Sequence, residues 1–278
     1  MLLGLLTLFS QRLAHDFTEK AQVPTSIIAL ETNSTEDKPS VLGIFFIPTP
    51  TLYVPIPTIP TFTTPKSSYR IAIIGDSMVD TMGERMEYLE AALKARYPRT
   101  QFELYNYGRG SERVADGLKR IDNHFANNDR RFDPLSSIHP DIIIVGSFAY
   151  NPYFPPNRDQ HHQDLLTLNE RMKQITPEVY QLIEIAPMRN GFGMGPQGVN
   201  WDPTTAYTHT GFILEQIESA KQVAHETNTP LIDVFTPSVT KDDGSGRSDL
   251  VSTADHIHPS VAGHQFMAEI IAKKIVFR

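Results

Sequence analysis

Three residues of this chain have the side chains needed for nucleophilic catalysis. Ser77 lies in the segment Gly-Asp-Ser-Met, and Asp255 and His258 lie together in Asp-His-Ile-His. A serine hydroxyl is a weak nucleophile until a base accepts its proton, and a neutral histidine is a suitable base near neutral pH. The histidine needs a carboxylate that orients it and stabilises its charged form. Because Asp255 precedes His258 by three residues, one loop can supply both groups. The alternative role for Ser77 is a helix cap.

Such a reaction also needs hydrogen-bond donors for the oxyanion of its tetrahedral intermediate. The sequence offers three candidates: the backbone amide of Ser77, a glycine amide in the segment Asn-Tyr-Gly-Arg-Gly, and the side-chain amide of Asn151. Gly108 and Gly110 are both candidates for the glycine position. The sequence therefore predicts an oxyanion hole built from Ser77, one of these glycines and Asn151.

The elements that position these residues alternate between strands and helices. Short apolar runs predict five strands, and 3.6-residue periodicity predicts the helices between and after them. The predicted strands are 70–77, 101–108, 141–147, 179–187 and 230–235, and the predicted helices are 84–97, 114–125, 165–175, 211–227 and 260–275. This alternation predicts a parallel sheet covered on both faces. Ser77, Gly110 and Asn151 each follow a strand, so we expect them at the carboxyl edge, where such sheets bind ligands.

Four segments together resemble the blocks of the SGNH, or GDSL-type, hydrolases. They are GDSM at 75–78, NYGRGS at 106–111, GSFAYNP at 146–152 and DHIHPS at 255–260, and the resemblance covers roughly residues 69–278. It implies a three-layer α/β/α sandwich, flavodoxin-like, around a five-stranded parallel sheet. It implies Ser77 as nucleophile, His258 as base with Asp255, and Gly110 and Asn151 as oxyanion donors beside the Ser77 amide. It implies no cofactor and no metal.

The third block departs from the family pattern, because Asn151 comes five residues after Gly146 and is followed by Pro152. No Gly-x-Ser-x-Gly segment occurs, which argues against the α/β-hydrolase fold proper. His256 and His258 form a His-x-His pair, so a metal site is the alternative chemistry there. His161 and His162, in a polar segment before residue 165, are expected to be solvent-exposed.

Composition limits the classes of function. The 278 residues carry a net charge of −7, so no overall basic surface is available for nucleic acid. Cysteine is absent, which excludes disulfides, thiolate metal ligands and a cysteine nucleophile. The expected partner is a small-molecule or glycan ester. The rival reading from another class is a non-catalytic binding module at the cell surface.

The first 66 residues differ from the rest of the chain. Apolar runs at 1–10 and 41–47 are shorter than the roughly 20 residues of a membrane-spanning helix, and a proline- and threonine-rich stretch follows at 48–66. We expect residues 1–66 to be an N-terminal segment with a linker and 67–278 to be the hydrolase domain. The apolar runs favour either a membrane tether, with an extracytoplasmic location, or an amphipathic helix on the domain.

A long insert at 188–207 contains the only tryptophan, Trp201, and many glycines and prolines. Loops of this length in compact domains are usually lids or binding loops, so we expect this loop to overhang Ser77. Its aromatic residues pack on the core or line an acyl or sugar pocket. The expected reaction is hydrolysis of a small ester, including O-acetyl or short-acyl groups on glycans, through an acyl-enzyme. Acyl transfer and lysophospholipid hydrolysis use the same triad.

Overall fold

The computed structural model describes residues 61–278, so the predictions for residues 1–60 lie outside the described residues. Five parallel strands form one sheet in the order β2-β1-β5-β6-β7. They are β1 Ser68–Gly75, β2 Gln101–Gly108, β5 Ile142–Val145, β6 Val179–Ile183 and β7 Leu231–Asp233. This strand order is that of flavodoxin-like sheets. The structure confirms the predicted fold class.

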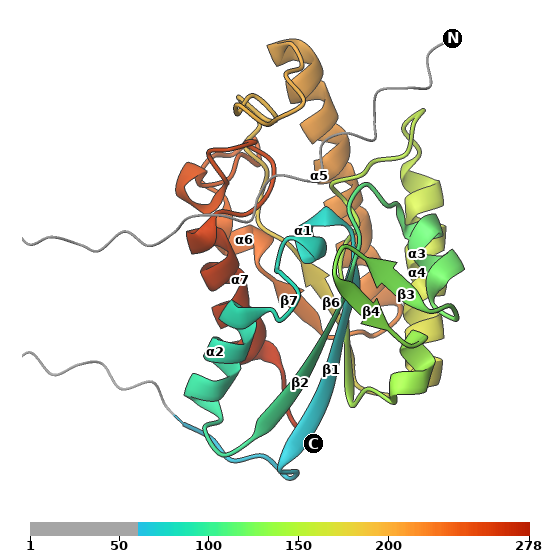
Figure 1. The fold of residues 1–278 in the computed structure, drawn as a ribbon. Helices are drawn as coiled ribbons and strands as arrows, with labels where there is room; N and C mark the ends of the chain where they lie inside the picture. Colours follow the sequence, from blue (N-terminus) through green and yellow to red (C-terminus); the bar gives the residue numbers. More distant parts are fainter. Residues whose placement is uncertain (1–60) are drawn as a thin grey trace, which may run out of the picture. The chain divides into compact units, whose positions relative to one another are not determined.

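The helices form two layers around this sheet (Figure 1). Helices α2 and α7 pack together on one face, and α3, α4 and α5 pack on the other. Their bounds are α2 Glu87–Arg96, α3 Val114–Arg120, α4 Arg158–Ile175, α5 Pro203–Glu226 and α7 Val261–Lys274. The short helices are α1 Ser77–Asp80, α6 Phe235–Ser238, η1 Leu135–Ile138 and η2 Ser248–Leu250.

The two central strands form the middle of the core. Residues 71–74 of β1 and 142–145 of β5 are buried, and these two segments consist almost entirely of branched aliphatic residues. Such continuous apolar runs are typical of parallel strands covered on both faces. Each buried side chain of this size contributes roughly 1.5–3 kcal/mol. The well-packed centre of the sheet therefore adjoins the carboxyl ends of β1 and β5. The segments that follow these two strands contain Ser77 and Asn151.

One predicted helix is shorter than its periodicity indicated. Helix α3 ends at Arg120, and Phe125 begins a two-stranded antiparallel hairpin of β3 Phe125–Asn127 and β4 Arg130–Phe132. The rings of Phe125 and Phe132 stack on each other at 5.9 Å and both contact Tyr107. This aromatic cluster, and not helical periodicity, determines where Phe125 lies.

Two other predicted helices begin earlier than expected. Asp202 caps α5 through the amides of Thr204 and Thr205, so residues 203–207 of the predicted loop are helical. Asn157 caps α4 in the same way, and His161 therefore lies inside a helix. His161 is fully buried, so the prediction of a solvent-exposed loop was wrong for it.

The end of the proline- and threonine-rich segment contacts the domain. The amide of Phe62 donates to the carbonyl of Arg96, whose guanidinium lies 4.1 Å from the Phe62 ring centre. Lys66 forms an ion pair with Asp141 at 2.6 Å. Among residues 61–278, no helix is long and apolar enough to cross a membrane.

Candidate active site

Ser77 is the first residue of α1, at the carboxyl end of β1 (Figure 1). The helix cap is Asp76, whose Oδ1 accepts the Met78 amide at 3.0 Å, so capping does not require the Ser77 hydroxyl. A Cβ on Gly75 would lie 2.3 Å from the Val79 side chain. Only glycine therefore allows α1 to fold this closely onto the strand that carries the serine.

Asp255 and His258 lie in one tight loop and contact each other directly. Asp255 Oδ2 lies 2.7 Å from His258 Nδ1, while Oδ1 accepts the backbone amides of Ile257 at 2.8 Å and His258 at 3.0 Å. A carboxylate at Nδ1 keeps the hydrogen on that nitrogen and leaves Nε2 as the acceptor. Burial raises the pKa of Asp255, but these hydrogen bonds outweigh burial, and its pKa is lowered overall.

The loop at 188–207 packs against the Asp255 loop, backbone to backbone. The Gln197 amide donates to the Ala254 carbonyl at 2.7 Å. A Cβ on Gly195 would lie 2.6 Å from the Ala254 oxygen and from the Asp255 nitrogen, and one on Gly198 would lie 2.6 Å from the Asp255 oxygen. The glycines of this loop therefore permit a close approach that supports the position of Asp255.

Two aromatic residues of the same loop, Phe192 and Trp201, pack against the core. Phe192 is buried and its ring lies 6.5 Å from Trp201, which contacts His209 at 4.6 Å. Trp201 is half-buried and packs against the core. His256 Nδ1 lies 3.2 Å from the carbonyl of Gly191, so it also holds this loop. Within residues 61–278, no cluster of three or more His, Cys, Asp or Glu side chains is arranged to hold a metal ion.

The second block is held by Asn106, which is fully buried. Its Nδ2 donates to the carbonyls of Val79 at 2.9 Å and Gly83 at 2.8 Å, and its Oδ1 accepts the Gly108 amide at 2.8 Å. The Gly108 amide is therefore already bonded. A Cβ on Gly108 would lie 2.3 Å from the Asp80 nitrogen, so its role is close backbone packing.

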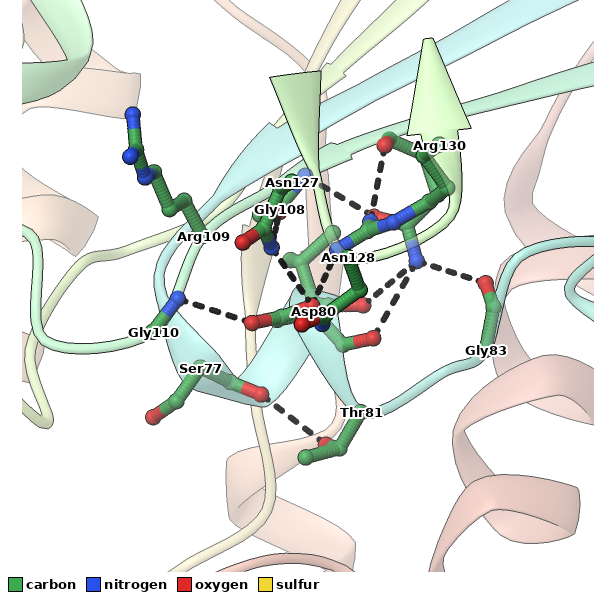
Figure 2. A network of polar contacts seen from close by, with 12 residues as sticks. Ser77, Asp80, Thr81, Gly83, Gly108, Arg109, Gly110, Asn127, Asn128 and Arg130 are labelled. Carbon is green, nitrogen blue, oxygen red and sulfur yellow. Dashed lines mark hydrogen bonds and ion pairs between the residues drawn. The ribbon is translucent and has the colours of Figure 1, made fainter. Parts of the chain in front are cut away.

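Gly110 lies beside Ser77, but its amide also has a partner. The site for a Cβ on Gly110 is 3.9 Å from Ser77 Cβ, and its N–H donates to Asp80 Oδ2 at 2.9 Å. Figure 2 shows Asp80 at the centre of this network, with Asn127 and Arg130 from the hairpin on its other side. Asn127 donates to Asp80 at 3.1 Å, and the buried Arg130 forms an ion pair with it.

Asn151 connects the third block to the first. Its side-chain amide donates to Asp76 Oδ2 at 3.1 Å. The structure thus places Asn151 next to the residue that precedes Ser77, as expected from their common edge of the sheet. One hydrogen of this amide is used by Asp76, and the amide carries a second.

Comparison with known proteins adds the family. The model of the GDSL-like Lipase/Acylhydrolase family matches residues 71–271. The chain belongs to this family. No curated protein matches the chain in sequence. Membership of the GDSL-like family supports a hydrolase, and it matches the resemblance drawn from the four blocks.

Solved structures share the fold of this GDSL-like hydrolase at low identity. An acetyl-xylooligosaccharide esterase from Geobacillus stearothermophilus is 18% identical, with a TM-score of 0.53, covering 80% of this chain and 97% of its own. A lipase/acylhydrolase from Enterococcus faecalis is 17% identical, with a TM-score of 0.55, covering 74% and 95%. An α/β hydrolase enzyme from the metagenome of Lake Arreo is 18% identical, with a TM-score of 0.54, covering 77% and 96%.

Two polar groups of this GDSL-like domain were missed by sequence reasoning. Asp80 is three residues after Ser77, and that helical spacing could have indicated that it lies near the nucleophile. Glu184, directly after β6, gave no signal within an apolar segment.

Complete burial, partly offset by hydrogen bonds from Met78 and Asn151 and by the charge of His258, raises the pKa of Asp76 to about 6. The influence of His258 on Asp76 shows that the two side chains are close enough for their charges to interact.

Proposed function

We propose that this GDSL-like hydrolase cleaves short-chain carboxylic esters, such as O-acetyl groups on carbohydrates, through an acyl-enzyme on Ser77. The observation that carries the proposal is the contact of 2.7 Å between Asp255 Oδ2 and His258 Nδ1. With the imidazole hydrogen held on Nδ1, Nε2 is available to accept the serine proton.

The reaction proceeds in two balanced steps. The Ser77 oxygen attacks the ester carbonyl carbon while His258 Nε2 accepts the hydroxyl proton. The intermediate collapses, the alcohol leaves with that proton, and an acyl-enzyme remains. Water then attacks the acyl carbon, His258 accepts a proton from it and returns one to Ser77, and the acid is released. Asp255 stabilises the charged imidazolium in both steps.

The oxyanion requires donors on the side of Ser77 away from the base. We assign the Ser77 amide and the second N–H of Asn151 to this role. The amide of Gly110, our first choice in the second block, donates to the Asp80 carboxylate, which would repel an oxyanion placed there. We therefore assign the amide of the next residue, Ser111, as the third oxyanion donor in place of Gly110. Ser111 has a φ of 63°.

The surroundings of the site support a polar alcohol group. Arg109 of the second block and Arg113, just before α3, are exposed, and the guanidinium of Arg113 lies 5.5 Å from the Tyr153 ring centre. Figure 2 shows Arg109 extending away from the Asp80 network. A rim of guanidinium groups and an aromatic ring suits the hydroxyl-rich face of a sugar better than a long acyl chain. The acetyl-xylooligosaccharide esterase with the same fold acts on a substrate of this kind. We propose the same class of substrate for this chain.

The test is a substrate screen with a covalent probe. Hydrolysis rates would be measured for p-nitrophenyl acetate and octanoate, acetylated xylo-oligosaccharides and a lysophospholipid. We expect the acetyl esters to be the best substrates, and a fluorophosphonate adduct on the peptide that contains Ser77. Ser77→Ala should abolish both, whereas Ser238→Ala should not. An adduct elsewhere overturns the nucleophile; a preference for octanoate or lysophospholipid overturns the substrate class. Absence of both turnover and adduct supports the binding module.

A further inference from the structure

A second buried carboxyl lies behind the nucleophile and has no part in the reaction described above. Glu184 follows β6 directly and is 1% exposed. Gly146, at the end of β5, separates it from β1: a Cβ on Gly146 would lie 2.9 Å from Glu184 Oε1 and 3.2 Å from the Gly75 Cα. The Glu184 carboxyl therefore lies within the packed ends of three adjacent strands, directly behind Asp76 and Ser77.

The contacts of Glu184 are with the segment that leads to Asn151. Its Oε1 accepts the Ser147 amide at 3.0 Å, and its Oε2 lies 2.5 Å from the Ser147 hydroxyl. That hydroxyl donates to Glu184 Oε2 and accepts the Ala149 amide at 3.1 Å. Two residues further along the chain, Asn151 donates to Asp76. Glu184 is therefore linked to Asp76 and Asn151 through one short, buried turn.

The neighbouring groups do not neutralise a negative charge on Glu184. In the part of the chain that the structure describes, neither Glu184 nor Asp76 forms an ion pair with Lys or Arg. His161 contacts the Ser147 carbonyl at 2.9 Å, but burial lowers its pKa to about 4, so it is neutral. The Tyr150 hydroxyl donates to the Ile185 carbonyl instead. His258, when it carries a charge, acts on Asp76.

Burying two charged carboxylates without a bonded cation costs a large amount of free energy, so one of them keeps a proton. Burial, together with the charge of Asp76, raises the pKa of Glu184 to about 8, above that of Asp76. Because the pKa of Glu184 is raised further than that of Asp76, Glu184 is the residue that we expect to keep a proton near neutral pH. Asp76 stays ionised and accepts the amides of Met78 and Asn151.

We propose that Glu184 is a positioning residue that, as a protonated acid, holds the turn from Ser147 to Asn151 so that Asn151 faces the oxyanion at Ser77. This inference rests on the proposed ester hydrolysis. Loss of the Glu184 proton adds a second negative charge behind the oxyanion and beside Asp76. Because the oxyanion is itself negative, the reaction then slows.

The experiment compares the pH dependence of kcat for the wild type, Glu184→Gln, Glu184→Ala and the control Glu178→Gln. Glu178 precedes β6 and pairs with the exposed Arg278, so the same change there alters only the surface. We expect Glu184→Gln to keep kcat near neutral pH and to lose the alkaline decrease of the wild type. Glu184→Ala should lower kcat by roughly 10²-fold at unchanged KM, because the turn shifts. Identical pH profiles for wild type and Glu184→Gln, or normal kcat in Glu184→Ala, overturn the proposal.

A second measurement tests the proton on Glu184 without any substrate. A raised pKa in the folded state means that the stabilisation is complete below the ordinary value of 4.5 and is lost as pH rises through about 8. The thermal midpoint of the wild type minus that of Glu184→Gln should therefore decrease across this window. A constant difference overturns the inference. If the decrease is seen but no ester is hydrolysed, the proposed function fails while the buried proton stands.

Discussion

Replacing Asp255 with asparagine gives a sharp test of the acid–base pair, because the change is isosteric. The carboxylate accepts three hydrogen bonds: two backbone amides on Oδ1 and His258 Nδ1 on Oδ2. Asparagine has one oxygen and one NH₂ group, so only one side of this arrangement can be kept. The outcome depends on which way the amide turns.

The hydrogen bonds decide the orientation. With its oxygen on the backbone amides, asparagine keeps two bonds and loses one charge-assisted bond, at a cost of about 1.5–3 kcal/mol. With its oxygen on His258, its NH₂ faces two amide donors, and each unsatisfied donor costs about 1–3 kcal/mol. The first orientation is therefore favoured by about 0.5–3 kcal/mol. It presents an N–H to His258 Nδ1, which must then accept, so the histidine hydrogen moves to Nε2 and the base is lost.

The expected loss in kcat is about 10⁴, the size known for this change in another triad, or about 5.5 kcal/mol of transition-state stabilisation. The assay is p-nitrophenyl acetate hydrolysis under saturating conditions, together with the thermal midpoint. The midpoint should fall by roughly 3–12 °C, because both backbone bonds remain and only the charge-assisted bond to His258 is lost. Asp249→Asn is the matched control, since that exposed carboxylate pairs only with Arg247 across the same loop region. An Asp255→Asn enzyme within tenfold of the wild type would refute the reasoning.

Three further predictions follow from the site. Asn151→Ala should lower kcat by roughly 10²–10³ with KM unchanged, and normal kcat with a lower midpoint would make Asn151 a turn residue only. Gly195→Ala places a Cβ 2.6 Å from the Ala254 oxygen, so we expect a loss of about 1–3 kcal/mol in stability and a lower kcat; unchanged values would contradict the supporting role of the loop. Because the pKa of Asp255 is lowered, its stabilisation is present above the ordinary 3.8 and lost below it, so the midpoints of wild type and Asp255→Ala should converge in acid.

The order and spacing of residues along the chain were enough to predict much of the candidate active site. The three-residue spacing of Asp255 and His258 was enough to predict their contact, because both lie in one loop. The positions of Ser77 and Asn151 followed from strand ends, since parallel strands bring their carboxyl ends to one edge. The early start of α5 was also recognisable, because Asp202 before Pro203 is a strong helix-start signal.

Only the tertiary structure decided which polar groups are free and which are already bonded. The Gly110 amide is occupied by Asp80, which Arg130, 50 residues away in sequence, holds in place. Glu184 contacts Ser147, which lies 37 residues earlier in the chain. Only this contact between distant residues shows that Glu184 is a buried acid behind Ser77. Hydrophobic periodicity describes which face of an element is buried, but contacts between distant polar atoms depend on strand register and on close backbone approach. Those are properties of the packed sheet, and no single segment contains them.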